Sequence, residues 1–361
     1  MQNQKRILIC PLDWGLGHAS RCIPIIRSLI KNNAEVIIAA DGRPLELLRL
    51  EFPDLKFIVF KGYAISYPDA GSMKLKMLFS IPKILKGIRE EHEQVEKIID
   101  EYKIDVVISD NRYGCWSKKV KSIFITHQLM IKSGVAEGIF HRKVLSYIKN
   151  YDECWVPDNE AIGELSGDLS HKYPLSENTY FIGTLSRFSD LSDSSENKSA
   201  LPANENLDVL AIVSGPEPQR TKLKTILKAQ LEKSGLKAVL ICGEPESTWE
   251  EKVNDKLTLY SHCNSADTFN LITKSNIIIA RSGYSTIMDM AALGKKAIFI
   301  PTPGQTEQEY LAEDLKNKKI AFYQKQSEFD LKIALGESEN YTGFKKIGKN
   351  KLLERRIENL I

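Results

Sequence analysis

The sequence predicts an α/β protein with two doubly wound parallel sheets, and three observations carry this prediction. Short apolar runs alternate with segments of helical periodicity along nearly all of the 361 residues. This alternation is typical of parallel strands joined by crossover helices. Residues 186–207 interrupt it with a run rich in Ser, Asn and Asp, after which the alternation starts again. The chain length also suits two domains of ordinary size.

The first domain is expected over residues 1–185, with amphipathic segments such as residues 18–32 and 90–102 between its strands. Its strand-like runs are RILICP, EVIIAA, KFIVF, DVVISD, SIFIT, ECWVP and YFIG. Residues 186–207 are the expected linker. The second domain, over residues 208–340, repeats the pattern with DVLAIVSG, KAVLICG, LTLYS, NIIIA and KAIFIP. Residues 341–361 are expected to form a C-terminal amphipathic helix that could pack back on the first domain.

Composition and charge argue against several classes of protein. The chain is 42% hydrophobic and 27% charged, as in soluble globular proteins, and its formal net charge of +3 is too small to predict nucleic-acid binding. No signal-peptide pattern and no stretch of about 20 apolar residues is present, so we expect a cytoplasmic protein. The six cysteines lack CxxC spacing, which indicates reduced thiols rather than a zinc site or a disulfide framework.

Polar loops follow five of the predicted strands, at the sheet edge where doubly wound proteins bind ligands. The loops are PLDWGLGHASR, SDNRYG and THQL in the first domain, and SGPEPQR and ARSGYST in the second. Glycine-rich turns are ordinary in such sheets, but all five loops also carry charged or hydroxyl side chains. We therefore expect a ligand site in a cleft between the two domains.

The loop ARSGYST has the features of an anion site. Arg281, Ser282 and Gly283 follow NIIIA and precede a helix expected over residues 284–293. The free N–H groups and the dipole of a helix start favour an anion. Asp289, inside that helix, could accept hydrogen bonds from a ribose diol, or it could be an ordinary solvated residue.

A second anion site is predicted in SGPEPQR. Ser214 and Gly215 let the backbone approach a ligand, and Arg220 can reach a phosphate with two donors, although an ordinary loop with a surface arginine fits as well. Neither loop matches GxxxxGK[ST], which argues against a P-loop ATPase. In PTPGQTEQEY, the adjacent Gln308 and Glu309 suit the recognition of vicinal hydroxyls, but such first turns are common.

The loop WGLGHASR contains G-x-G-x-x-S and lacks the third glycine of the dinucleotide fingerprint. Asp41 ends the second strand, where that fingerprint expects an acid, so an NAD-dependent oxidoreductase is one alternative. His18 and Arg21 are features that the fingerprint does not require. His18 lies at the expected helix start, where it can act as a base or a donor, or can simply cap or pack.

Together, GLGHASR, SGPEPQR and RSGYSTIMDMAALGKKAIFIPTPGQTEQEY resemble the family-28 glycosyltransferases, relatives of the transferase that adds N-acetylglucosamine to lipid I and of the plastid galactolipid synthases. The resemblance covers most of the chain and is strongest over residues 257–316. It implies the GT-B fold, in which two Rossmann-like domains face a cleft. The N-terminal domain would bind the acceptor and the C-terminal domain a sugar nucleotide, usually UDP-linked. UDP-sugar hydrolases and 2-epimerases share this fold, and GLGHASRC in particular resembles the hydrolases.

The resemblance also implies roles for single residues. Asp289 stands where the family has a glutamate that holds the ribose. Gln308 and Glu309 stand where the lipid I enzyme has two glutamines that touch the donor sugar, and the departure at Glu309 leaves the sugar open. Residues 261–263, Ser-His-Cys, fall where uracil is contacted through the backbone. The implied donor-binding residues are Ser214, Gly215, Arg220, His262, Cys263, Arg281, Ser282, Gly283, Ser285, Asp289, Gln308 and Glu309.

The expected activity is that of an inverting hexosyltransferase with a UDP-sugar as co-substrate and without a cofactor or an essential metal. Helix N-termini, with Arg220 and Arg281, would stabilise the charge that builds on UDP. An acceptor hydroxyl needs a general base, for which His18 is the first choice. Asp110 and His127 also end strands and are the alternatives, although Asp110 could cap a turn and His127 could pack beside it. The acceptor-side loop residues are Gly15, Gly17, Arg21 and Asn111. A non-catalytic sugar-nucleotide sensor is a further alternative.

A basic and apolar segment over residues 72–89 predicts contact with a membrane surface. Between Asp69 and Glu90 there are five Lys or Arg residues and no acid, and Pro82 is expected to divide the segment into a loop and a helix. Such a segment can lie on an anionic bilayer and bring the site to a lipid-linked acceptor at the cytoplasmic face. Its apolar side could equally pack on the sheet.

Overall fold

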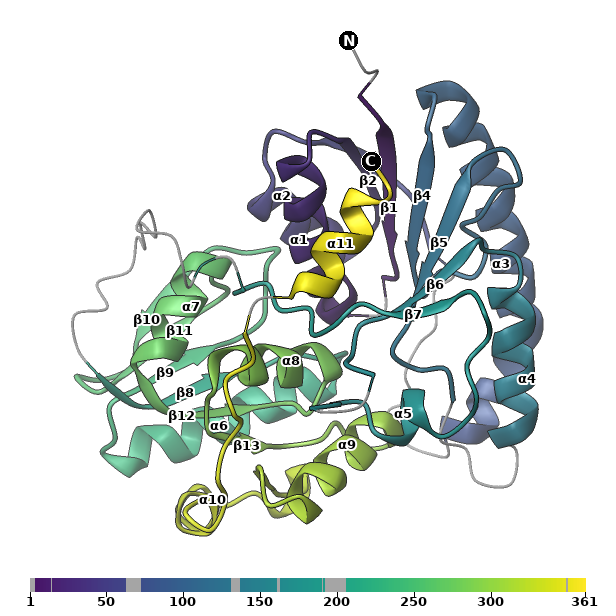
Figure 1. Cartoon of the computed structure of the whole chain (residues 1–361). Coiled ribbons are helices and arrows are strands. Elements are labelled where there is room, and N and C mark those ends of the chain that lie inside the picture. Colours follow the sequence, from purple (N-terminus) through teal and green to yellow (C-terminus); the bar gives the residue numbers. More distant parts are fainter. Residues whose placement is uncertain are drawn as a thin grey trace. The chain divides into compact units, whose positions relative to one another are not determined.

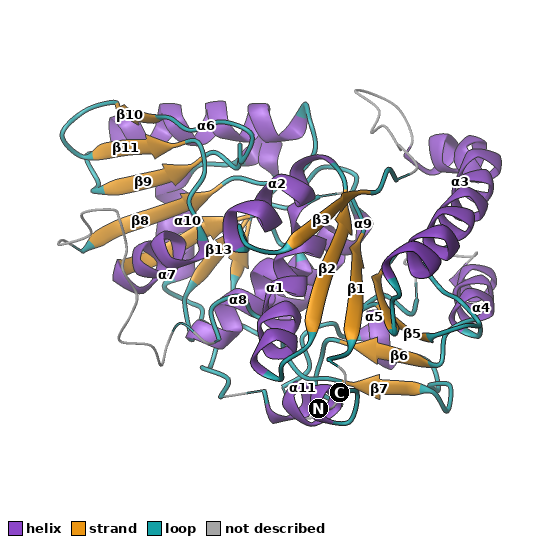
Figure 2. Ribbon diagram, turned by 90° about the horizontal axis from the view of Figure 1, so that it is seen from above, coloured by secondary structure: helices purple, strands orange, loops and turns teal. Residues whose placement is uncertain are grey.

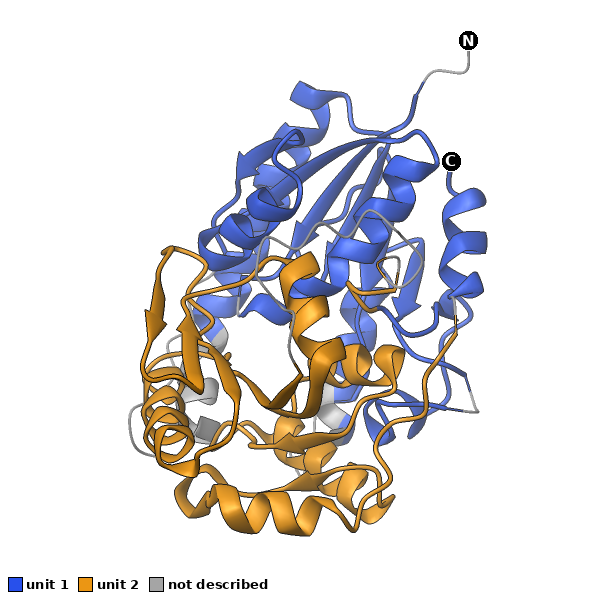
Figure 3. Ribbon diagram, turned by 90° about the vertical axis from the view of Figure 1, so that its left-hand side faces the viewer, with its two compact units in different colours: residues 1–185, 350–361 blue, residues 186–349 orange. Residues whose placement is uncertain are grey.

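The computed structural model (Figure 1) describes residues 4–13, 15–62, 73–130, 137–160, 163–189, 191, 206–348 and 350–361, with the backbone alone at 73–81, 137, 139 and 140. The chain forms two compact units. Unit 1 comprises residues 1–185 and 350–361, and unit 2 comprises residues 186–349 (Figure 3).

Unit 1 contains a parallel seven-stranded sheet in the order β3-β2-β1-β4-β5-β6-β7. The strand order reverses between β1 and β4, which is where ligands bind in such sheets. The strands are β1 (Arg6–Pro11), β2 (Glu35–Ala40), β3 (Lys56–Val59), β4 (Val106–Asp110), β5 (Lys121–Ile125), β6 (Glu153–Val156) and β7 (Thr179–Phe181). The helices are α1 (Leu16–Lys31), α2 (Gly42–Glu51), α3 (Met73–Tyr102), α4 (Glu137–Ile148), α5 (Asp168–His171) and α11 (Lys351–Glu358).

Helices cover both faces of this sheet because its strands are apolar on both sides. Leu8 and Cys10 of β1 pack against Val95 and Ile99 of α3. Figure 2 shows α1 and α2 on the other side of the sheet from α3. The fully buried strands thus explain the near-continuous apolar runs in the sequence.

Unit 2 contains a second sheet, in the order β10-β11-β9-β8-β12-β13-β14, which is parallel except where β10 meets β11. Its strands are β8 (Leu207–Ile212), β9 (Ala238–Ile241), β10 (Glu250–Lys252), β11 (Leu257–Tyr260), β12 (Ser275–Ala280), β13 (Ala297–Phe299) and β14 (Phe322–Tyr323). Its helices are α6 (Gln219–Ser234), α7 (Ser265–Lys274), α8 (Tyr284–Leu293), α9 (Thr306–Asn317), α10 (Leu331–Ser338) and the short 3-10 helix η2 (Gln326–Glu328).

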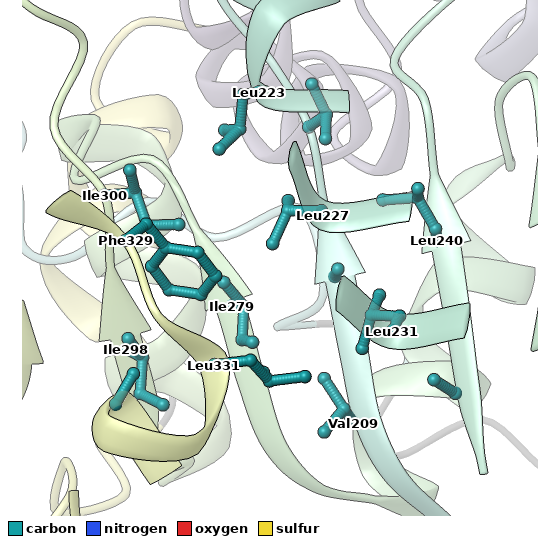
Figure 4. Close-up of a cluster of buried hydrophobic side chains, with 14 of the residues drawn as sticks. Val209, Leu223, Leu227, Leu231, Leu240, Ile279, Ile298, Ile300, Phe329 and Leu331 are labelled. Atoms are coloured by element: carbon teal, nitrogen blue, oxygen red, sulfur yellow. The ribbon is translucent and has the colours of Figure 1, made fainter. Parts of the chain in front are cut away.

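A leucine stripe on α6 anchors the core of unit 2 (Figure 4). Leu223, Leu227 and Leu231 recur every four residues, so they share one face of the helix, and all are buried. They pack in one cluster with strand residues that include Val209 and Ile279. Burying each such side chain contributes about 1.5–3 kcal/mol.

The predicted doubly wound α/β class is confirmed, with three differences in detail. The antiparallel β10 and the two-residue β14 have no counterpart among the predicted strands. The C-terminal helix is shorter than the predicted segment, because the side chain of Asn350 caps its start by accepting from Leu353 N. Of the predicted linker, residues 190 and 192–205 lie outside the described residues.

The predicted break at Pro82 is wrong, because α3 continues through this residue. Proline removes one N–H donor from a helix, but most helical stability comes from tertiary packing rather than from any single bond. Pro24 lies inside α1 in the same way. Among the described residues, no helix combines the length and the apolar character that a membrane span requires.

Candidate functional site

The structure brings four predicted residues of unit 1 together at the carboxyl edge of its sheet. His18 and Arg21 lie in the first two turns of α1, directly after β1, and Asp110 is the last residue of β4. His127 follows β5 by two residues. Because β1, β4 and β5 are neighbours in the sheet, the strand order places all four side chains at the reversal point.

Asp110 is the centre of this cluster and has no exposed surface. Its Oδ1 lies 2.7 Å from His18 Nδ1. Arg21 donates to both carboxylate oxygens through Nε and Nη2. Burial acts to raise the pKa of Asp110, but Arg21 and His18 outweigh it and hold the pKa at about 2. The carboxylate is therefore ionised at neutral pH.

The two histidines differ in their hydrogen-bond partners. His18 Nδ1 lies 2.7 Å from Asp110 Oδ1, which only accepts, and 2.9 Å from Arg21 Nη2, which only donates. When the Nδ1 proton is directed to Asp110, the lone pair of the ring is on Nε2. Arg21 only donates, so His127 Nδ1, 2.6 Å from Arg21 Nη1, is an acceptor and its proton is on Nε2. In that tautomer His18 Nε2 can accept a proton, whereas His127 Nδ1 is already an acceptor for Arg21.

The contacts of Asp110 and His127 argue against the two alternatives for the general base. Asp110 is buried, chelated by Arg21 and held at a pKa of about 2, so it positions His18 rather than taking a proton itself. The ring of His127 is only 4% exposed and its Nδ1 is occupied by Arg21, so it cannot serve as the base through that atom.

The remaining acceptor-side residues lie on the same edge. Gly15 precedes α1 with a φ of 147°, which favours glycine, and Gly17 lies in the first turn of the helix. Asn111 follows Asp110 and also has a positive φ, 55°. Asp41 caps α2 by accepting from Gly42 N at 2.9 Å, so its place at a strand end has a structural explanation without a dinucleotide.

In unit 2, α8 begins at Tyr284 with Gly283 as its N-cap and without a side-chain cap. A helix start of this kind favours an anion through the positive end of the helix dipole. Ser282, just before it, donates from Oγ to Gln308 O at 2.8 Å, which joins the loops after β12 and β13. Ser285 is half-buried in the first turn of α8.

Gln308 and Glu309 hold their own loop together. The Gln308 amide accepts from Thr302 N at 2.8 Å and donates to Gln305 Oε1 at 2.5 Å. Glu309 Oε1 accepts from Gly304 N at 3.1 Å. An amide oxygen and an amide nitrogen can each make a second hydrogen bond, so this bonding fixes the loop and leaves each side chain capacity for a ligand.

The terminal nitrogens of Arg281, a predicted phosphate ligand, are bonded within unit 2. Arg281 is 1% exposed, and Nη1 donates to the carbonyls of Ile300 and Pro301 at 3.0 and 3.1 Å. Its Nη2 donates to Gln219 O and Gln326 Oε1 at 2.9 and 2.6 Å, so all four terminal N–H groups are used. Burial lowers the pKa of Arg281 to about 10.

The guanidinium of Arg220 also donates hydrogen bonds to other residues of unit 2. Its Nε donates to Glu217 Oε1 at 2.7 Å and its Nη1 to Gly243 O at 2.8 Å. Glu246 lies 3.6 Å from Nη1, so two carboxylates surround this guanidinium. These contacts join the loops after β8 and β9 and argue against the expected role of Arg220 in neutralising a diphosphate.

Asp289 meets two residues that sequence reasoning assigned to the linker. Ser186 Oγ donates to its Oδ1 at 2.7 Å, and Arg187 Nε lies 3.6 Å from its Oδ2. Burial raises the pKa of Asp289 to about 6 against the opposing effect of Arg187. Arg187 lies in a Ser- and Asp-rich run, and the sequence pattern there did not predict a role for it.

Asp289→Asn is expected to raise the free energy of unfolding at pH 7 by about 1–3 kcal/mol. The folded pKa of about 6 lies above the ordinary aspartate pKa of 3.8, and the difference costs up to about 3 kcal/mol when the carboxylate is charged. Because a raised pKa favours the protonated folded state, the cost is fully present above pH 6 and disappears as the pH falls below 4. Urea unfolding at pH 7 and pH 4 measures this; an equal difference at both pH values contradicts it.

The residues expected near uracil follow β11 at the same edge of the sheet. Ser261 is buried and donates from Oγ to Ser247 O at 2.9 Å, and His262 is half-buried. Burial raises the pKa of Cys263 to about 12, so its thiol is not a nucleophile at neutral pH. The carbonyl of Cys263 accepts from Thr268 Oγ1 at 3.3 Å.

Comparisons with known proteins find similarity to glycosyltransferases. The model of the glycosyltransferase family 28 C-terminal domain matches residues 218–338, and that of glycosyl transferase family 1 matches residues 5–128. An uncharacterized glycosyltransferase of Methanosarcina mazei is 23% identical over 331 residues, which cover 84% of this chain and 81% of the relative.

Two further matches show the relation to a named enzyme and to its fold. The UDP-N-acetylglucosamine--N-acetylmuramyl-(pentapeptide) pyrophosphoryl-undecaprenol N-acetylglucosamine transferase of Thermodesulfovibrio yellowstonii is 22% identical over 311 residues, covering 82% of this chain and 78% of that enzyme. The crystal structure of Acinetobacter baumannii MurG aligns with a TM-score of 0.56 at 12% identity, covering 99% of each chain.

Proposed function

We propose that the chain is a family-28 glycosyltransferase of the GT-B fold that moves a hexose or N-acetylhexosamine from a UDP-sugar to an acceptor hydroxyl with inversion. The observation that carries this proposal is the His18–Asp110 pair, because transfer to a hydroxyl needs a base and this pair supplies one.

The proposed step begins with removal of a proton from the acceptor. His18 Nε2 takes the hydroxyl proton, and the oxygen forms a bond to the anomeric carbon on the face opposite UDP. The bond between that carbon and the β-phosphate oxygen breaks, and UDP leaves with the electron pair. Asp110 then stabilises the imidazolium through Nδ1–H.

The donor side must stabilise the charge that builds on the leaving diphosphate. Since Arg281 and Arg220 are committed to carbonyls and carboxylates, we assign this task to the N-terminus of α8 and to the backbone at Ser214 and Gly215. Asp289 would hold the ribose. The name of the Thermodesulfovibrio yellowstonii relative gives a UDP-sugar donor and a lipid-linked acceptor, which supports the same classes of substrate for this chain.

A thermal-shift panel followed by a UDP-release assay tests the proposal. UDP and one or more UDP-sugars should stabilise the protein, whereas NAD should not, since stabilisation follows the ratio of ligand to dissociation constant. UDP release should depend on a hydroxyl acceptor and survive excess EDTA. Equal UDP release without any acceptor would identify a hydrolase or an epimerase. Binding of a UDP-sugar without turnover would identify a sensor. A strict need for Mn²⁺ would refute the metal-independent mechanism.

We also propose that the chain binds peripherally to an anionic cytoplasmic leaflet through residues 72–89, of which residue 72 and the side chains of 73–81 lie outside the described residues. In the described part, Lys83 and Lys86 are exposed and Leu85 is 44% exposed. Each basic residue near such a surface contributes about 1 kcal/mol. This geometry supports an acceptor that is a lipid or cell-envelope glycan precursor.

Changing Lys83 and Lys86 to Glu is expected to weaken co-sedimentation with vesicles containing phosphatidylserine at low salt. Two charge reversals remove attraction and add repulsion, so the bound fraction should drop severalfold. The matched control reverses Lys252 and Lys332, two exposed lysines of unit 2, and should bind like wild type. Wild-type protein that stays in the supernatant would refute the membrane contact and favour a soluble acceptor.

A further inference from the structure

A buried hydroxyl in unit 2 has no partner in the described part of the chain. Thr302 is 1% exposed, and its Oγ1 lacks any hydrogen bond there. Its backbone is satisfied, because Thr302 N donates to Gln308 Oε1 at 2.8 Å and Thr302 O accepts from Gln305 N at 3.0 Å. A buried hydroxyl without a partner costs about 1–3 kcal/mol, so this position favours a partner from outside the chain.

The hydroxyl borders the glycine turn after β8. Gly215 has a φ of 105°, which side chains rarely adopt, and a Cβ built on it would lie 3.5 Å from Thr302 Oγ1. Among the described atoms, that Cβ would meet no other neighbour within 4 Å. The space beside Gly215 is thus open apart from this hydroxyl, and a glycine has no side chain to displace when a ligand enters.

Three loops meet at this point. Gln308 accepts from Thr302 N through its amide and from Ser282 Oγ through its carbonyl, so Thr302 is tied to the start of α8. The strands β8, β12 and β13, which precede these loops, are consecutive in the sheet. A ligand at the Gly215 turn and at the N-terminus of α8 would therefore lie next to Thr302.

We propose that Thr302 Oγ1–H donates a hydrogen bond to the β-phosphate of the nucleotide, an inference that rests on the proposed function. The proposed uracil residues follow β11, two strands away from β8, so the nucleotide runs from there toward β12 and β13. In that direction the β-phosphate, which is farther from the nucleoside than the α-phosphate, is the phosphate that lies nearer to Thr302. A hydroxyl is a suitable donor here because the nearby Arg281 has no terminal N–H left.

The test compares UDP with UMP on the full chain by titration calorimetry. Thr302→Val, which keeps the shape and removes the hydroxyl, should weaken UDP about tenfold or more and change UMP less than about twofold. Thr302→Ser should bind UDP nearly as wild type does. The unliganded Val variant should be at least as stable as wild type, because it removes a buried hydroxyl that has no described partner. The matched control is Thr273→Val, whose Oγ1 bonds within its own helix to Asn270 O at 2.9 Å, and it should bind both nucleotides normally.

Each other outcome overturns the inference in a distinguishable way. If Thr302→Val binds UDP like wild type, the role of Thr302 is wrong while the proposed function stands. Equal losses for UMP and UDP would indicate a role at the nucleoside or in the loop structure. A clear loss of stability without ligand would show that the chain itself supplies a partner. If wild type binds neither nucleotide, the inference and the proposed function both fail.

Discussion

His18→Ala is expected to lower kcat by about 10²–10⁴-fold, the usual contribution of a positioned general base. The dissociation constant of UDP should change less than about twofold, because His18 belongs to unit 1 and the proposed nucleotide residues belong to unit 2. Initial rates of UDP release with a hydroxyl acceptor measure the first quantity, and titration calorimetry measures the second.

The matched control for this prediction is His92→Ala. His92 also lies in unit 1, but its ring stacks on Trp116 at 4.2 Å between centroids and does not belong to the Asp110 cluster. That variant should keep its turnover. A His18→Ala enzyme that turns over at nearly the wild-type rate would remove His18 from the role of base.

The fold could be predicted because parallel strands buried on both faces require near-continuous apolar runs, and those runs are visible in the sequence. The sequence did not predict β10, because its residues, Glu-Glu-Lys, are exposed and polar and it pairs only at the sheet edge. β14 is only two residues long, too short to produce a periodic signal.

The sequence identified the catalytic candidates but not the contact between them. His18 and Asp110 lie 92 positions apart, and no local pattern indicates that β1 pairs with β4. They therefore stood as competing bases, whereas in the structure Asp110 orients His18. Such a pairing depends on strand order, which sequence periodicity does not contain.

The arginines of unit 2 show that a local pattern does not identify the acceptor of a cation. Arg281 and Arg220 were interpreted as phosphate ligands because a cation follows a strand end, but their acceptors are carbonyls and carboxylates on other loops. Thr302, in a loop rich in proline, gave no signal, because only the packed structure shows that its hydroxyl lacks a described partner. Charge in a sequence indicates where hydrogen bonds form, but not whether protein or ligand receives them.

Asp110→Ala is expected to lower the free energy of unfolding at pH 7 by about 3–5 kcal/mol, and to abolish most activity because His18 loses its orienting partner. The variant leaves the guanidinium of Arg21, whose side chain is 2% exposed, without its carboxylate, and breaking a buried pair from one side carries this cost. Changing Arg21 to Met in the same chain should recover part of the stability but none of the activity. Urea unfolding and UDP-release rates measure the two effects. The control variant is Asp105→Ala, at an exposed carboxylate that accepts from Arg6 N, and it should lower the free energy of unfolding by about 1 kcal/mol or less.

The pH dependence separates the ion pair from simple loss of packing. The folded pKa of Asp110 is about 2 and the ordinary aspartate pKa is 3.8, a depression that contributes about 2 kcal/mol of stability. Because the folded pKa is lowered, this contribution is fully present above the ordinary pKa and is lost as the pH falls from there toward 2. The difference in stability between wild type and Asp110→Ala should therefore be constant from pH 7 to about pH 5 and shrink as the pH approaches 3. A difference that stays unchanged down to pH 3 would mean that the carboxylate stabilises the fold by filling space, and that its pairing with Arg21 and His18 contributes little.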